Sequence, residues 1–256
     1  MIFDSHVHTA FSADSQMKAE DALLMAEKLG LGLVFTEHLD WSYPGEQEFT
    51  FDQDNYWRTY ENLRGKQLHL GVEIGMCAGD EEANRTFAGK VPFDMVIGSV
   101  HLLQGKDIYY KDFYEGKKQQ EVYREYFLTM AAMLRTHTFV DVLGHIDYIA
   151  RYAPYANPAL CYRDFNQEID EVLRAAVETD TVMELNTRRL GHPEVFAELY
   201  PIYKRYHELG GRYITIGSDA HKPEAIGTVF SLAVAFLEQC SLIPVTFCKR
   251  KIEKIG

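Results

Sequence analysis

Two pairs of residues in this sequence have the type and spacing of metal ligands. One residue separates His6 from His8, and one separates Asp219 from His221. Side chains two positions apart in an extended strand point to the same face, so each pair can converge on one ion. Neutral imidazole and carboxylate together suit divalent zinc, manganese or iron. The two motifs therefore predict transition-metal chemistry.

More residues of the same types are spread along the chain. The full set of candidate ligands is His6, His8, Asp14, His38, Glu73, His101, His145, Asp219 and His221. Taking about four protein ligands for a closed zinc site and about three for a catalytic one, this set would supply about three ions and leave positions for water and substrate. A single strand histidine is more often a hydrogen-bonded core or surface residue. The metal interpretation rests on where the six histidines fall together.

Nearly all of these candidates follow or end predicted strands. Short β-rich runs alternate with longer segments of helical period, as in parallel strands joined by crossover helices. The predicted strands are 2–7, 32–37, 69–74, 93–100, 139–144, 181–186 and 213–217. About seven β/α units in one chain of this length favour a barrel, whose functional residues lie at the C-terminal ends of the strands. The other four histidines, His69, His137, His192 and His207, fall elsewhere.

The predicted helices complete the pattern of alternation. They cover residues 19–29, 53–64, 117–135, 164–178, 202–209 and 224–239, and Gly30 is expected to cap the first of them. No linker or shift in composition divides residues 1–256, so we expect a single α/β domain. An open doubly wound sheet is the alternative, but no G-x-G-x-x-G follows the first strand to indicate dinucleotide binding.

The composition excludes several other classes of protein. The 256 residues are 46% hydrophobic and 25% charged, as in an ordinary globular protein. The formal net charge of -12 disfavours nucleic acid as a partner. We expect no membrane segment, since no apolar run approaches the roughly 18 residues that a spanning helix needs. The four cysteines form no C-x-x-C pair, and the chain shows no export signal, so we expect reduced thiols and a cytoplasmic protein.

The ligand set occurs in short motifs that resemble those of the polymerase and histidinol phosphatase (PHP) superfamily of metal-dependent phosphoesterases. The matching segments are His6-x-His8 with Asp14, Thr36-Glu37-His38, Gly98-Ser99-Val100-His101 and Ser218-Asp219-Ala220-His221, with Glu73 and His145 between them. The resemblance spans nearly the whole chain, so it implies one phosphoesterase domain over residues 1–256 and a distorted (β/α)7 TIM-like barrel. Several members carry histidine in place of Asp14; the aspartate resembles the histidinol-phosphatase branch.

The resemblance also implies three divalent ions, with zinc expected first and iron or manganese as alternatives. The first ion would be held by His6, His8, Glu73 and Asp219; the second by Glu73, His101 and His145, with Glu73 as a bridge; and the third by Asp14, His38 and His221. The alternative for Asp14 is a turn or a cap of the helix near Met17.

Phosphate recognition needs cations besides the metals, preferably guanidinium groups that can contact two oxygens. Arg151 follows the His145 segment, and Arg188 and Arg189 follow the sixth strand. They resemble the phosphate-binding arginines of the histidinol-phosphatase branch. Arg151 is the first expectation, and Arg188 is preferred to Arg189 because neighbours on a loop usually point apart.

The implied function is hydrolysis of a small phosphate monoester, first of all L-histidinol phosphate in histidine biosynthesis, by attack of a hydroxide that bridges two ions. Glu73 would share the two ions, and Asp14 or His221 would assist the leaving group. Three alternatives remain: a phosphatase of another metabolite such as a nucleoside monophosphate, a PHP-type nuclease acting on phosphodiesters, and a non-enzymatic scaffold. The sequence predicts no oligomeric state.

Overall fold

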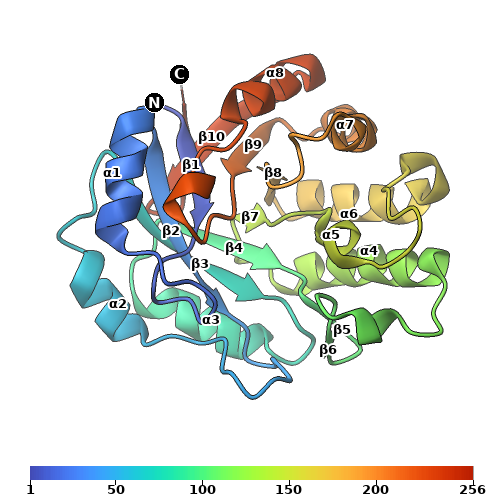
Figure 1. Ribbon diagram of the computed structural model, residues 1–256, viewed down its shortest axis with the longest axis horizontal. Helices are drawn as coiled ribbons and strands as arrows, with labels where there is room; N and C mark the ends of the chain where they lie inside the picture. The colour runs from blue at the N-terminus through green and yellow to red at the C-terminus, as the bar shows by residue number, and fades with distance from the viewer. Residues whose placement is uncertain (256) are drawn as a thin grey trace.

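Seven parallel strands form the centre of the computed structural model, which describes residues 1–255 (Figure 1). They are β1 (Phe3–Val7), β2 (Gly32–Leu39), β3 (Leu68–Gly75), β4 (Met95–Ser99), β7 (Val142–Leu143), β8 (Val182–Asn186) and β9 (Tyr213–Gly217). Each strand pairs with the next one in this series. A parallel bridge between Val7 and Ala220 brings the first and last strands together. The distorted (β/α)7 barrel expected from the sequence is confirmed, and each predicted strand is present.

Helices surround these strands (Figure 1). They are α1 (Ala19–Leu29), α2 (Gln53–Tyr60), α3 (Glu81–Lys90), α4 (Gln119–Thr136), α5 (Tyr148–Tyr152), α6 (Asn166–Glu178), α7 (Pro193–Glu208) and α8 (Phe230–Cys240). The six predicted helices are confirmed, whereas α3 and α5 were not predicted. Gly30 ends α1 with a left-handed φ of 67°, as expected for a helix-capping glycine. Within the described residues, no helix combines the length and apolarity needed to cross a membrane.

Side chains on the two faces of the barrel belong to different hydrophobic clusters. Phe35 of β2 packs in the large cluster that includes the apolar residues of the helices, whereas its neighbour Val34 belongs to a smaller cluster with Phe3 and Met95. Because neighbouring residues of a strand point to opposite faces, the smaller cluster fills the barrel interior. Its members Val34 and Ile97 are the strand partners of His69 and Glu73, so the cluster extends through the interior up to the level of Glu73.

A one-residue irregularity in β1 sets the direction of its histidines. Phe3 pairs with Gly32 and Val7 pairs with Phe35, so four residues on β1 span three on β2. A bulge of this kind switches which residues face inward. Phe3 faces the interior before the bulge, and His6 does so after it. The alternation in the sequence predicted that His6 and His8 share a face, but it did not predict the bulge.

The chain after β9 adds a hairpin that the sequence analysis did not predict. β10 (Ile243–Cys248) pairs in parallel with β9, and β11 (Lys251–Lys254) pairs antiparallel with β10. The backbone N–H of Lys249 donates to the carboxylate of Asp94 at 2.8 Å. A second short hairpin, β5 (Leu102–Leu103) with β6 (Lys106–Asp107), follows directly after His101.

Candidate metal centre

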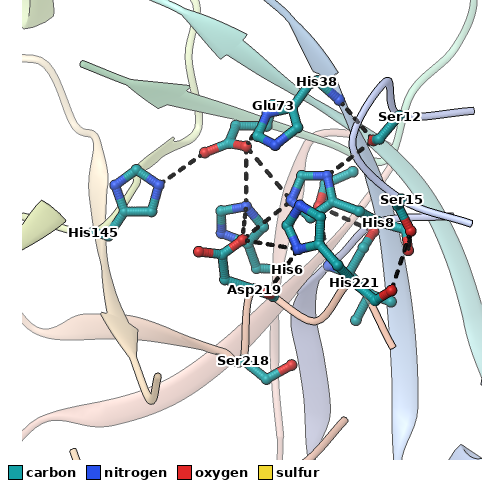
Figure 2. A network of polar contacts seen from close by, with 12 residues as sticks. His6, His8, Ser12, Ser15, His38, Glu73, His145, Ser218, Asp219 and His221 are labelled. Carbon is teal, nitrogen blue, oxygen red and sulfur yellow. Dashed lines mark hydrogen bonds and ion pairs between the residues drawn. The ribbon is translucent and has the colours of Figure 1, made fainter. Parts of the chain in front are cut away.

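The structure brings all nine predicted ligands together at the C-terminal end of the barrel strands. Figure 2 shows Glu73 between His38 and His145, and Asp219 facing His6, His8 and His221. Three groups of side chains each place one ligand atom per residue within 4.8 Å of the others in the same group. The groups are His6, His8 and Glu73; His38, Glu73 and His101; and His8, His38 and His221. The predicted convergence of side chains from distant parts of the chain is therefore present.

Glu73 is the centre of the cluster. Its Oε2 lies 2.9 Å from His38 Nδ1 and 3.2 Å from His6 Nε2. Its Oε1 lies 3.0 Å from His145 Nε2 and 3.4 Å from His101 Nε2. Burial raises the pKa of Glu73, but the surrounding imidazoles, led by that of His6, hold the pKa well below its usual range. An ionised, fully buried carboxylate with imidazoles on both oxygens is suited to bridging two cations.

Asp219 supplies the second buried carboxylate. Its Oδ1 lies 3.4 Å from His8 Nε2 and 3.9 Å from His6 Nε2. Burial raises the pKa of Asp219, but the contact with His8 and the charge of His6 lower it well below its usual range. The backbone of Asp219 has a φ of 56°, in the left-handed region that non-glycine residues seldom adopt. Such strain is typical of residues held in place for a functional contact.

Asp14 lies at the mouth of the cluster, in the loop after β1. Its Oδ2 is 3.1 Å from His221 Nε2 and 3.6 Å from His38 Nε2. Its side chain is 40% exposed, in contrast to the buried Glu73. The three residues predicted to form a third site therefore do lie together, although His38 also contacts Glu73.

Carboxylates behind two of the histidines fix their tautomers. His6 Nδ1 lies 2.7 Å from Glu184 Oε1, and His101 Nδ1 lies 3.0 Å from Asp40 Oδ1. A carboxylate only accepts, so each Nδ1 carries a proton, and Nε2 is the nitrogen that would present a lone pair to an ion after losing its own proton. Those Nε2 atoms point toward Glu73. This pairing of an imidazole with a carboxylate behind it is the usual support of a metal-bound histidine.

His8 reaches the same tautomer through a serine. The hydroxyl of Ser12 donates to Glu37 Oε2 at 2.6 Å, so Ser12 Oγ can only accept from His8 Nδ1 at 3.0 Å. Burial lowers the pKa of His8, and the neighbouring His38 and other imidazoles lower it further, so the ring is neutral. Its Nε2 therefore presents a lone pair as well.

The buried atoms at the centre fit a cation. Nε2 of His6, Nε2 of His8 and Oε2 of Glu73 are buried and make no hydrogen bond to any residue from 1 to 255. Lone pairs of nitrogen and oxygen repel at distances such as the 3.2 Å between His6 Nε2 and Glu73 Oε2, unless a positive charge lies between them. The donor set of imidazole and carboxylate is the one that divalent zinc, manganese or iron accepts. The structure therefore contains clusters able to bind metal ions.

The supporting residues Ser12, Asp40 and Glu184 were not predicted. Glu184 lies in one of the strand-end segments, but its hydrogen bond joins residues 178 positions apart, so only the fold reveals it. Its second oxygen accepts from the backbone N–H of His145 at 2.8 Å. Glu184 thus connects two of the predicted ligands.

The arginines that follow β7 and β8 occupy different positions. Arg151 is buried behind Asp219, to which its Nη1 donates at 2.7 Å, and its Nε and Nη2 have no hydrogen-bond partner in the described chain. Arg188 lies on the wall of the cavity above the cluster. Arg189 turns to the carboxylates of Asp147 and Glu198, at 3.1 and 3.3 Å. The predicted phosphate contacts of Arg151 and Arg188 remain predictions.

A cavity of about 470 Å³ opens over the ligands. His38, His101 and Asp219 line its floor together with other members of the cluster, and Tyr109 and Asp107 are among the residues of its wall. A volume of this size holds a small metabolite. The site is therefore an open pocket above a metal-binding cluster, whereas a purely structural metal site is closed by its ligands.

Comparison with known proteins gives consistent results. The family model described as "PHP domain" matches residues 4–188. The chain is 48% identical over 250 residues to a probable histidinol-phosphatase of Clostridium acetobutylicum, covering 98% of each chain. It is 30% identical to the histidinol-phosphatase of Lactococcus lactis, covering 85% of this chain and 83% of the other. A histidinol phosphate phosphatase structure from Lactococcus lactis, solved with zinc, L-histidinol and phosphate, superposes with a TM-score of 0.93 and 28% identity over 99% of both chains.

Proposed function

Because the chain belongs to the PHP domain family, we propose that it is a metal-dependent phosphatase that hydrolyses L-histidinol phosphate to L-histidinol and phosphate. The enzyme is a phosphoric monoester hydrolase and acts in histidine biosynthesis. Relatives that match 98% and 85% of the chain carry that activity in their names. The observation that carries the proposal is the convergence of His6, His8, Glu73 and Asp219 beneath an open pocket.

The proposed cofactors are three divalent ions, with zinc first. His6, His8, Glu73 and Asp219 would hold one ion, Glu73, His101 and His145 a second, and Asp14, His38 and His221 a third. The zinc in the Lactococcus lactis structure supports this choice of metal. When bound, such ions lower the pKa of water and offset charge on the phosphoryl oxygens.

The protein's own residues would orient the ester for this attack. Arg188 lies on the cavity wall, and Arg151 has two buried donor nitrogens, Nε and Nη2, that make no hydrogen bond to any described residue. A guanidinium group binds phosphate through two parallel hydrogen bonds. The carboxylates of Glu73 and Asp219 stay ionised and so keep the cluster in the form that binds cations. Most catalysis of phosphoryl transfer comes from positioning and charge neutralisation of this kind.

The leaving alkoxide needs its charge offset, and Asp14 and His221 at the pocket mouth can provide for this. They lie 3.1 Å apart, and both line the cavity. With the third ion bound between them, that ion would stabilise the alkoxide. Without it, a proton shared by the carboxylate and the ring nitrogen would serve as the acid.

The wall of the pocket fits a cationic leaving group. Asp40 and Asp107 line the cavity, and the rings of Tyr109 and Tyr152 pack against each other at its edge, 4.7 Å apart. The amine of histidinol is positively charged at neutral pH and its imidazole is planar. Carboxylates favour the first group and aromatic rings the second.

We place the reaction in the cytoplasm, where free thiols like those of the four cysteines are usual.

A panel of three substrates separates this proposal from its competitors. Release of inorganic phosphate is measured with L-histidinol phosphate and with a nucleoside monophosphate, and aryl release with a bis-aryl phosphodiester. The proposal expects kcat/KM for histidinol phosphate to exceed that for either of the others. Preferred cleavage of the nucleotide would indicate a different monoesterase, preferred cleavage of the diester a nuclease, and no turnover of any ester a scaffold.

A further inference from the structure

The N-terminal end of the barrel strands carries a second cluster of ligand-type side chains. His69 is the second residue of β3, and Cys248 and Glu253 lie on the hairpin of β10 and β11. One ligand atom of each lies within 4.8 Å of those of the other two. Glu73 is four residues further along β3, a distance of about 13 Å at about 3.3 Å per residue. The cluster is therefore separate from the candidate metal centre.

The register of the hairpin places two of the three ligands on one face. Cys248 pairs with Lys251, and Thr246 pairs with Glu253. Cross-strand partners point to the same face, as do residues two apart on one strand. Cys248 and Glu253 are therefore diagonal neighbours on the same face of the hairpin.

His69 supplies the third ligand from the body of the barrel. It is only 4% exposed, and its ring stacks on that of Phe3 with the centroids 4.6 Å apart, which fixes the ring plane. Its Nδ1 is buried and makes no hydrogen bond in the described part of the chain. A buried imidazole nitrogen without a partner costs free energy that a bound ion would recover.

The charges around the cluster suit a divalent ion. The guanidinium of Arg64, whose charge acts on His69 and Cys248, is held by both oxygens of Asp94 at 2.6 and 2.5 Å, so its charge is offset. On coordination Cys248 would lose its thiol proton to solvent and bind as thiolate. With the carboxylate of Glu253 the ligands would then carry two negative charges, which match one divalent cation.

We propose that His69, Cys248 and Glu253 bind one zinc-type divalent ion that ties the C-terminal hairpin to β3. One nitrogen, one sulfur and one oxygen are a ligand set that zinc accepts, and water completes the tetrahedron because Glu253 is exposed. The site would also stabilise the hairpin, because in the described residues β11 pairs with β10 alone and its four residues are exposed. Lys254 lies over the ring of Tyr213 at the end of β11, and a metal bridge would add a second long-range connection.

Cobalt substitution tests the site without reference to phosphatase activity. The full-length protein is loaded with Co²⁺, and the near-ultraviolet absorption from charge transfer between thiolate and cobalt is recorded. The candidate metal centre contains no cysteine, so this band reports the new site alone. The wild type is expected to show it, and Cys248→Ser to lose both the band and one equivalent of bound metal. Phosphatase activity in Cys248→Ser should stay within about twofold, which is under 0.5 kcal/mol.

The matched control is Cys161→Ser, which removes an exposed cysteine outside the cluster and should keep the band. Glu253→Gln gives a second variant, at an exposed position where the fold is not at risk, and should weaken cobalt binding at least tenfold. Hydrogen exchange of residues 251–254 should slow on metal addition in the wild type only. Absence of the band in the wild type, or a band of equal strength in Cys248→Ser, would overturn the proposal.

Discussion

Glu73 holds an ionised carboxylate in a fully buried position, which is stable only with positive charge beside it. Its two oxygens face ring nitrogens of five histidines. The neutral substitution Glu73→Gln removes the charge that two ions would share. We expect loss of bound metal and a fall in kcat of about 10³-fold or more, since metals contribute several kcal/mol of transition-state stabilisation. Elemental analysis and phosphate release on one sample check this, and full activity in a metal-depleted variant would contradict it.

Glu184 tests the residues that support the ligands. It accepts from His6 Nδ1 and from the backbone of His145. Glu184→Gln keeps the shape but removes the charge that orients His6, so metal affinity should fall about 10- to 100-fold. The control is Glu194→Gln, at a side chain 70% exposed in α7, which should change neither quantity. Equal metal affinity in the two variants, measured by competition with a chelator, would rule out the supporting role.

Among single residues, the sequence predicted the candidate metal ligands but not the carboxylates that hydrogen-bond to them. The H-x-H and D-x-H motifs are local, so residue type and spacing were enough to select His6, His8, Asp219 and His221. The partners Asp40 and Glu184 make contacts between residues 61 and 178 positions apart. No local pattern encodes such a contact, and it becomes visible only when the strands are in place.

At the scale of elements, β9 approaches β1 and β8 so closely that only glycine fits at position 217. A Cβ there would lie 2.1 Å from Glu184 Oε1 and 2.6 Å from His6 Cβ. Gly217→Ala should therefore displace both residues, lower stability by about 1–3 kcal/mol and reduce activity. Gly89→Ala is the control, because a Cβ in α3 meets nothing within 4 Å and alanine favours a helix by up to about 1 kcal/mol. Urea unfolding and kcat measure both effects; an unchanged Gly217→Ala protein would contradict the close approach.

A carboxylate joins α6 to its neighbours. Asp170 accepts from Tyr162 at 2.7 Å and from Arg205 at 2.9 Å, and it is 7% exposed. Burial raises the pKa of Asp170, but the hydrogen bonds of Arg205 and Tyr162 outweigh it and leave the pKa below its usual value. A lowered folded-state pKa stabilises the fold above the unfolded value of about 3.9, and this contribution disappears as the pH falls through the folded-state pKa.

Asp170→Asn should therefore destabilise the protein at pH 7 by about 1–2 kcal/mol, the usual cost of losing a charged hydrogen bond at a partly exposed site. The difference from wild type should shrink as the pH falls below about 4. Free energies of unfolding in urea at several pH values give this difference, and acid effects common to both proteins cancel. A gap that stays constant down to pH 3 would contradict the lowered pKa.

The elements that the sequence missed are those with weak or misleading local patterns. α3 begins in an acidic run, Glu81-Glu82, and such runs are typical of a solvated surface and give no apolar periodicity that would indicate a helix. The bulge in β1 adds one residue without any change of composition. The strand β10 did carry a usable signal, because Val245, Thr246 and Phe247 form a short buried run of β-branched and aromatic residues, and Val245 and Phe247 pack inside the barrel. The seven barrel strands were found because each is a buried β-rich run of ordinary length.

At the scale of the whole molecule, the barrel assembles one site from segments that span positions 6 to 221. The predicted ligands come from or directly follow β1, β2, β3, β4, β7 and β9, so the proposed metal centre would form only when the ring of strands is complete. In the proposed function a net charge of -12 would not prevent phosphate binding, because bound metal ions with Arg151 and Arg188 would set the potential inside the pocket. The charge does disfavour long polyanions, which would contact the outer surface as well.

The proposed hydrolysis requires that the clustered imidazoles and carboxylates bind divalent ions. The most direct measurement strips the purified protein with a chelator, verifies the metal content by elemental analysis, and follows phosphate release from L-histidinol phosphate before stripping, after it, and after zinc is added back. We predict that kcat falls by about 10³-fold or more in the metal-free protein and returns as zinc binds. A metal-free protein that turns over histidinol phosphate at the original rate would contradict the account.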